Sequence, residues 1–193
     1  MQTASERAKG DAGATVREVT IRRLDENDVA AYHALRQRGL AEHPEAFTSS
    51  AEEEAGSMDK ASRRLASDVN GSHDVVLGAF DGERLIGFVG MSVDPRIKAR
   101  HRGHVYGMYV AAENARRGVG ARLVDALVAH ATARGSLDAL VLTVTAGNDG
   151  AQRLYERAGF TRFGLEPGAV RVGGRSYDKV HMIRWLGAQS RAS

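Results

Sequence analysis

Residues 106–160 read YGMYVAAENARRGVGARLVDALVAHATARGSLDALVLTVTAGNDGAQRLYERAGF. This pattern predicts a strand, a short basic loop from Arg116 to Ala121, a helix, a second strand and a second helix. A turn of small residues brings backbone N–H groups close to a ligand, and the positive end of the helix macrodipole lies behind them. That geometry suits a pyrophosphate, so the segment predicts a site for a phosphorylated cofactor.

Length and composition predict one compact domain, at 15–187, with flexible tails at 1–14 and 188–193. The chain has 193 residues, and 42% of them are hydrophobic, which is enough for a full core. It has no cysteine, which excludes a disulfide scaffold and a thiol nucleophile and leaves little basis for structural zinc. No apolar run approaches the ~20 residues that span a bilayer, and no signal-peptide core is present. We therefore expect a cytoplasmic protein that does not bind membranes.

The charge balance is typical of an ordinary soluble protein. The formal net charge is +3, with both signs interspersed along the chain. Nucleic-acid binding usually needs a concentrated basic face, so we expect no nucleic-acid partner. The basic loop at 95–103 has no interleaved aromatic residues and is interpreted as a solvated connection. An anionic small ligand fits the charge balance equally well.

The first third of the chain predicts a strand and two helices. Residues 16–23 alternate apolar and polar side chains, as a strand does. Asp25 and Asp28 form a helix-start pattern, and Pro44 ends that helix. A short surface helix is predicted at 52–65, where the acidic run Glu52–Glu54 either attracts a cationic acceptor or simply marks the helix start.

The rest of the chain continues as strands and helices. The turn pair Asp81-Gly82 separates strands at 75–80 and 84–93, and another strand follows at 104–111. The later elements are a helix at 118–134, a strand at 137–145, a helix that Asn148 caps and Gly159 ends, and hairpin strands at 170–172 and 177–185. The order predicts an α/β fold, one mixed sheet with helices on both faces.

Taken together, these motifs resemble the GNAT superfamily of acyl-CoA-dependent N-acyltransferases. The resemblance covers roughly residues 15–187 and implies a mostly antiparallel sheet. It rests on the ordered set Met108-Tyr109-Val110, the loop 116–121, Asn148, the run Leu154 to Phe160, and Tyr177-Asp178 with Met182. The family loop often begins with Gln or Arg, where this chain has Ala115, so a side-chain role at that position is in doubt. The backbone cradle is unaffected, because it needs amides and small residues.

Two other phosphate-binding interpretations fail on spacing. No Gly-Lys-Ser/Thr follows the loop, so nothing would hold the magnesium ion of a nucleoside triphosphate. The glycine spacing is also short for a dinucleotide-binding motif, and the loop comes late in the fold.

The resemblance implies an N-acetyltransferase that uses acetyl-CoA, needs no metal and acts on a small-molecule or peptide amine. It leaves a homodimer open. The implied cofactor-binding residues are Met108, Tyr109, Val110, Arg116, Arg117, Gly118, Val119, Gly120, Ala121 and Asn148. Backbone groups of Met108 and Val110 would pair with the pantetheine arm, which needs a splay in the sheet that a sequence cannot show.

The resemblance also implies catalytic roles. Tyr155 would protonate the departing CoA thiolate, although a packing tyrosine explains its place on the apolar side of its helix equally simply. His104 is our first choice for the base that accepts the amine proton, with His101 and Tyr106 as alternatives. A His101–His104 metal pair is not expected, since no cysteine or nearby carboxylate completes it. A non-catalytic acyl-CoA-binding module and, less favoured, a nucleic-acid-associated regulator remain the other hypotheses.

Overall fold

A computed structural model describes residues 18–56, 58–66 and 74–187. The predicted tails at 1–14 and 188–193 lie outside these residues. The strands of the single sheet are β1 (Val19–Arg23), β2 (Val75–Asp81), β3 (Arg84–Val93), β4 (Arg102–Val110), β5 (Ala139–Thr145), β6 (Thr161–Val172) and β7 (Arg175–Trp185). They lie in the order β1-β2-β3-β4-β5-β7-β6. All neighbours are antiparallel except β4 and β5.

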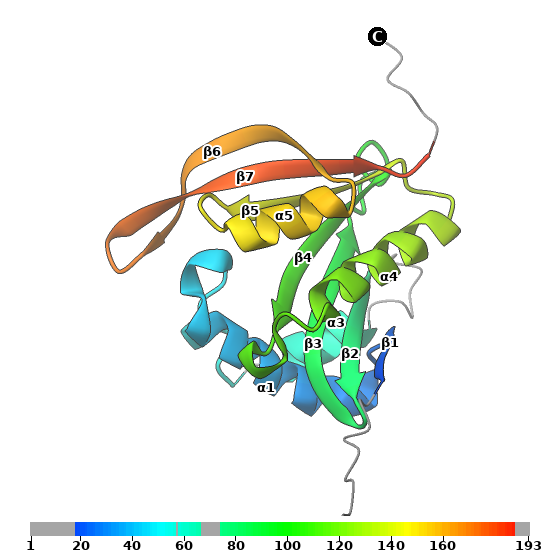
Figure 1. Ribbon diagram of the computed structural model, residues 1–193, viewed down its shortest axis with the longest axis vertical. Helices are drawn as coiled ribbons and strands as arrows, with labels where there is room; N and C mark the ends of the chain where they lie inside the picture. Colours follow the sequence, from blue (N-terminus) through cyan, green and yellow to red (C-terminus); the bar gives the residue numbers. More distant parts are fainter. Residues whose placement is uncertain (1–17, 57, 67–73, 188–193) are drawn as a thin grey trace, which may run out of the picture.

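Helices cover both faces of this sheet, as the sequence predicts (Figure 1). They are α1 (Val29–Glu42), α2 (Ala51–Glu54), α3 (Met58–Ala66), α4 (Val119–Ala133) and α5 (Asp149–Arg157), with short 3-10 turns at Glu26–Asp28, Pro44–Ala46 and Ala112–Asn114. No helix of the described segments is long and apolar enough to cross a membrane.

Two hydrophobic cores lie on opposite faces of the sheet. The first contains the apolar sides of α4 and α5, and the second contains those of α1 and α3. The strand β2 contributes to both, because successive strand side chains point to opposite faces: Val75 and Leu77 join the first core, and Val76 joins the second. The fold class predicted from the sequence is therefore confirmed.

Two local predictions differ from the structure. The helix predicted at 52–65 is two helices, α2 and α3, because α2 ends at Glu54 and Ala55 turns to extended backbone. The strand predicted at 170–172 is the end of the much longer β6. The sequence does not predict the first part of β6, because β6 is an edge strand that is exposed over most of its length. Such a strand lacks the alternation of apolar and polar residues that marks a half-buried strand.

The sheet opens between β4 and β5. Their parallel ladder has three residue pairs, which run from Arg102–Ala139 to His104–Val141. The described residues of β4 beyond His104 have no ladder partner on β5, and Figure 1 shows the two strands fanning apart there. This is the splay that pairing with a cofactor arm requires, because backbone groups along the open edge are left without a strand partner.

A β-bulge in β4 lies within the splay. Phe88 of β3 pairs with Tyr109, but Gly90 pairs with Tyr106, so β4 carries one extra residue at this point. Gly107 adopts φ +67°, a left-handed conformation that glycine tolerates at low cost. The extra residue changes which face later side chains occupy: Val105 packs in the α4–α5 core and Tyr109 in the α1–α3 core.

A buried ion network joins α1, α2 and α3. The Glu54 carboxylate, 4% exposed, accepts hydrogen bonds from Arg36 Nη2 at 2.7 Å and from Arg64 Nη2 at 3.0 Å. Burial alone would raise the pKa of Glu54, but the hydrogen bonds and charges of the two arginines outweigh it and lower the pKa to about 2. Glu54 is therefore an anchor for three helices, and the suggestion that it attracts a cationic acceptor is wrong for this residue.

Replacing Glu54 by glutamine should destabilise the fold, because Arg36 and Arg64 lose their carboxylate. We expect Glu54→Gln to lower the free energy of unfolding at neutral pH by about 3–5 kcal/mol, measured by urea denaturation. A carboxylate whose pKa is lowered by folding makes its full contribution to stability above its ordinary pKa. That contribution is lost as the pH falls towards the pKa of the folded state. The difference from wild type should therefore narrow as the pH falls below about 4.5.

The control is Glu83→Gln at an exposed turn position, which should change stability by less than about 0.5 kcal/mol. Equal losses of unfolding free energy in the two variants would contradict the anchoring role of Glu54. So would a stability difference between Glu54→Gln and wild type that stays the same in acid.

Candidate functional site

The largest described cavity, about 720 Å³, lies against the open edge of β4. Met108, Tyr109 and Val110 line one side of it, and Asn148 and Leu154 line another. The loop before α4 closes it with Arg116 and Gly118, followed by the first residues of the helix, Val119, Gly120 and Ala121. The structure thus brings nearly all the predicted cofactor-binding residues around one cavity.

The N-terminus of α4 supplies the anion-binding part of this cavity. Its N-cap, Gly118, adopts φ +74° and gives no side-chain hydrogen bond to the helix. The amide of Arg122 donates to the Gly118 carbonyl at 3.1 Å, so the amides of Val119 to Ala121 precede the first backbone bond of the helix. Uncapped amides backed by the helix macrodipole form a site for phosphate groups.

The two loop arginines have different positions. Arg116 adopts φ +62° and lines the cavity. Arg117 is not among the cavity-lining residues, because its Nη1 donates to Asn114 Oδ1 at 2.8 Å and to Asp81 Oδ2 at 3.2 Å. Arg116 therefore remains the candidate for screening phosphate charge with its side chain, and Arg117 could contribute to phosphate binding only through its backbone.

Tyr155 lies at the inner end of the site. It is 6% exposed, and its ring packs edge-on against Phe160 with the ring centroids 5.8 Å apart. It also lines a smaller cavity of about 110 Å³, together with Tyr106, Gly107 and Met108 at the bulge of β4. Burial raises the pKa of the phenol, so Tyr155 stays protonated at neutral pH. The packing role and the proton-donor role are thus compatible.

Asn148 has a structural role that the sequence predicts. Its Oδ1 accepts a hydrogen bond from the amide of Ala151 at 3.1 Å and so caps α5. Asn148 also lines both the large and the small cavity. The cap uses the side-chain oxygen, so the amide nitrogen is the group that remains for a cofactor contact.

The three base candidates lie in different places. His104 is exposed on β4, opposite Ser92 and Val141, and is not among the lining residues of the cavities beside Tyr155. His101 is half-buried in the turn before β4. Tyr106 does line the small cavity, and burial raises its pKa. The structure therefore brings Tyr106, rather than His104, to the Tyr155 end of the site, and the identity of the base stays a prediction.

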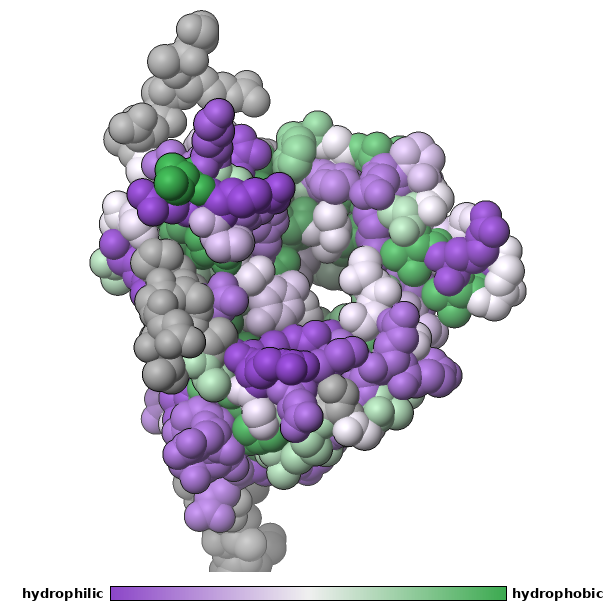
Figure 2. Space-filling view, turned by 180° about the vertical axis from the view of Figure 1, so that it is seen from behind, coloured by the Kyte–Doolittle hydropathy of each residue, from purple (hydrophilic) through white to green (hydrophobic). Residues whose placement is uncertain are grey.

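A third cavity, about 250 Å³, continues the small one towards the opposite face of the sheet. It shares Phe47, Tyr106 and Gly107 with the small cavity and adds Arg36, Arg64 and Lys179 to the lining. Figure 2 shows the molecule hollowed near its middle on this side, with strongly hydrophilic side chains beside the hollow. The splay therefore links cavities on the two faces of the sheet.

The sequence analysis missed the basic residues of this third cavity. Arg36 lies four residues after Tyr32 and four before Leu40, in the apolar row of α1, and a charge at that position is the signal that could have found it. Lys179 is buried, and its Nζ donates to the carbonyls of Glu45 and Ala46 at 2.9 and 3.0 Å and to Thr145 Oγ1 at 2.9 Å. Burial lowers its pKa. Nothing in its local pattern marks these contacts.

The loop at 95–103 is a surface turn, as interpreted from the sequence. Arg96 is exposed and forms an ion pair with Asp94 in the same turn. Within residues 18–56, 58–66 and 74–187, no group of three or more His, Asp or Glu side chains could hold a metal ion.

A comparison with known protein families identifies the family of this chain. Residues 32–160 match the family model of the Acetyltransferase (GNAT) family. No curated protein sequence matches the chain.

Solved structures share the fold at low sequence identity. A GNAT-family acetyltransferase from Streptococcus pneumoniae superposes with a TM-score of 0.81 at 24% identity, covering 88% of this chain and 100% of the other. The yncA protein of Salmonella typhimurium, solved with its cofactor acetyl-CoA, gives 0.80 at 20% identity over 91% and 98% of the two chains. The ribosomal-protein-alanine N-acetyltransferase of Brucella melitensis gives 0.71 at 23% identity over 86% and 99%.

Proposed function

The chain belongs to the GNAT acetyltransferase family, and from this premise we propose that it moves an acetyl group from acetyl-CoA to a primary amine by direct attack. The observation that carries the proposal is one continuous path of cavities. It runs from the uncapped N-terminus of α4, along the open edge of β4, to Tyr155. The yncA structure, which contains acetyl-CoA, supports the choice of donor at the level of the fold.

The residues along this path fit the parts of acetyl-CoA in order. The amides of Val119 to Ala121 and the Arg116 side chain would hold the diphosphate. Backbone groups of Met108 and Val110 would pair with the pantetheine arm, because the splay leaves them without a partner on β5. The bound thioester would then lie near Gly107 and Tyr155.

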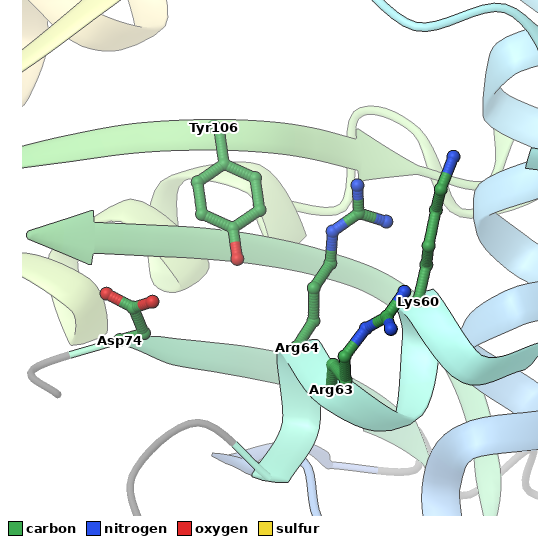
Figure 3. Close-up of a pocket in the computed structure, with 5 residues that line it drawn as sticks. All are labelled: Lys60, Arg63, Arg64, Asp74 and Tyr106. Atoms are coloured by element: carbon green, nitrogen blue, oxygen red, sulfur yellow. The ribbon is translucent and has the colours of Figure 1, made fainter. Parts of the chain in front are cut away.

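The acceptor must lose a proton before or during attack. A lysine-like amine has a pKa near ~10.4, so presenting its free form at neutral pH costs roughly 4.6 kcal/mol. Tyr106 lines the Tyr155 cavity, but its hydroxyl points towards α3 (Figure 3), so it would take up this proton only through an intervening water. His104, on the exposed part of β4, would act only through a longer chain of waters.

Tyr155 would stabilise the leaving thiolate. The burial that raises the pKa of its phenol would also raise the pKa of a thiol released into the same cavity, so the two groups stay close enough for proton donation. When the amine attacks the carbonyl carbon, the carbon–sulfur bond breaks and the Tyr155 proton goes to sulfur. The rate would come mainly from positioning and electrostatics, without a covalent enzyme intermediate.

The test of the whole proposal is turnover with an amine library. Purified protein with acetyl-CoA should release free CoA thiol in the presence of some primary amines, detected with a thiol reagent. Tight acetyl-CoA binding without release by any amine would instead indicate a non-catalytic acyl-CoA-binding module.

The variant Tyr155→Phe should lower kcat by about 10²-fold or more while leaving the Kd of acetyl-CoA nearly unchanged, because only the donated proton is lost. Tyr177→Phe on β7 is the matched control, since Tyr177 lies outside the linings of the described cavities. Wild-type turnover in Tyr155→Phe would reject the acid role.

The variant Gly120→Glu should abolish acetyl-CoA binding. A Cβ at Gly120 would lie 3.1 Å from Met108 Cε and 3.4 Å from Leu154 Cδ2, so a longer side chain places a carboxylate inside the cavity. Gly120→Ala is the control and should bind nearly normally, because both neighbours are flexible side-chain ends. Calorimetric titration measures the acetyl-CoA affinity of both variants. Normal affinity in Gly120→Glu would overturn the proposal that the cofactor binds at the N-terminus of α4.

Replacing the two loop arginines should change acetyl-CoA binding to different degrees. Arg116→Ala should weaken acetyl-CoA binding by about fivefold, and less at high salt, because one partly screened charge is lost. Arg117→Ala should leave the Kd nearly unchanged, since its side chain is held by Asn114 and Asp81. Equal effects in the two titrations would show that the orientation of Arg117 is wrong.

A further inference from the structure

Two cavities on the α1–α3 side of the splay each have several basic side chains in their lining. The cavity of about 250 Å³ that holds Arg36 and Arg64 shares Arg64 and Tyr106 with another of about 260 Å³, which Lys60, Arg63 and Asp74 complete. In Figure 3 the Tyr106 ring points from β4 towards α3, with Arg64 on one side of its hydroxyl and Asp74 on the other. The two cavities therefore form one route from the surface at α3 to the bulge of β4.

One buried donor on this route has no partner. Arg36 is 5% exposed, and its Nε and Nη2 both donate to Glu54. Its Nη1 is buried and has no hydrogen-bond partner within the described residues. A Cβ built at Gly107 would lie 3.1 Å from this Nη1, so the nitrogen lies beside the bulge. A buried guanidinium nitrogen without an acceptor is unfavourable, and an oxyanion placed there would satisfy it.

The charge around the route is positive after the internal ion pairs are counted. The basic side chains are five, Arg36, Arg64, Lys179, Lys60 and Arg63, and the carboxylates are two, Glu54 and Asp74. Asp74 is also engaged, because its Oδ1 accepts a hydrogen bond from the amide of Val93 at 2.9 Å. Such a route favours an anionic group and opposes a polycation.

We propose that the acetyl acceptor carries an oxyanion, as an amino acid does, and that Arg36 Nη1 with the charge of Arg64 binds this group on the α1–α3 side of the splay. This inference rests on the proposed acetyl transfer. The oxyanion end of the acceptor would lie towards α1 and α3, and its amine would reach past Gly107 towards the thioester. The amine nitrogen forms the new amide bond, and the oxyanion takes no part in bond making or breaking.

Binding to the CoA-loaded protein tests the site without turnover. The probes are matched sets: amino acids, their primary carboxamides and their decarboxylated amines, each with the same side chain. Calorimetric titration should show that at least one amino acid binds about tenfold or more tightly than its carboxamide, which is the effect of one charge-assisted hydrogen bond. Equal or tighter binding of the carboxamides and amines throughout would overturn the proposal.

Variants test whether the named arginines cause the preference. Arg36→Lys keeps a cation beside Glu54 but removes Nη1, and it should reduce the preference for the acid about tenfold while leaving acetyl-CoA affinity unchanged. Arg64→Met is the second variant if Arg36→Lys does not fold, because Arg64 is partly exposed and Arg36 still pairs with Glu54. Arg100→Met, at an exposed loop position, is the control and should keep the wild-type preference.

The outcomes separate the two proposals. Acid-selective binding that Arg36→Lys removes, without CoA release from any amine, would sink the acetyl transfer and keep the oxyanion site. Turnover with no preference for acids, or a preference that both arginine variants retain, would sink the oxyanion site and keep the acetyl transfer.

Discussion

The parallel ladder between β4 and β5 ends after three residue pairs, and the site depends on that interruption. Backbone donors and acceptors along the rest of β4 are left facing a cavity rather than a neighbouring strand. Such groups are unfavourable unless they find partners, so the open edge favours a ligand that can pair with it as an added strand would. The bulge at Gly107 lies in this open stretch and places Tyr106 beside it, on the route to the opposite face.

Two buried cations hold the walls of the opening in place by different means. Lys179 on β7 donates to the carbonyls of Glu45 and Ala46, and so fixes the segment before Phe47 against the part of the sheet formed by β5, β7 and β6. Arg36 on α1 pairs with Glu54 and so fixes α1 and α2 to each other beside the part of the sheet formed by β1 to β4. The Lys179 ammonium uses all three of its protons on the protein, whereas the Arg36 guanidinium keeps one nitrogen unpaired. Only the second cation therefore remains for a ligand.

Local sequence predicts the elements of this protein better than it predicts the site. The turn pair Asp81-Gly82 and the cap at Asn148 are local signals, and the structure has both. The loop before α4 was also predicted, because glycine and arginine spacing is itself local. The splay is different, since the apolar patterns of β4 and β5 do not encode how many ladder pairs the strands share. The turning of Arg117 towards Asp81 was missed for the same reason, because its partner lies 36 residues away.

Electrostatics link the two faces of the sheet into one chemical arrangement. On one face, the uncapped amides of α4 would attract the phosphates of the donor, and on the other the arginines beside the bulge would attract an oxyanion of the acceptor. The same arginines would affect the reacting amine, because a nearby positive charge lowers the pKa of an ammonium group. That effect reduces the roughly 4.6 kcal/mol needed to present a free amine at neutral pH. A site built in this way would therefore depend less on a strong general base to deprotonate the amine.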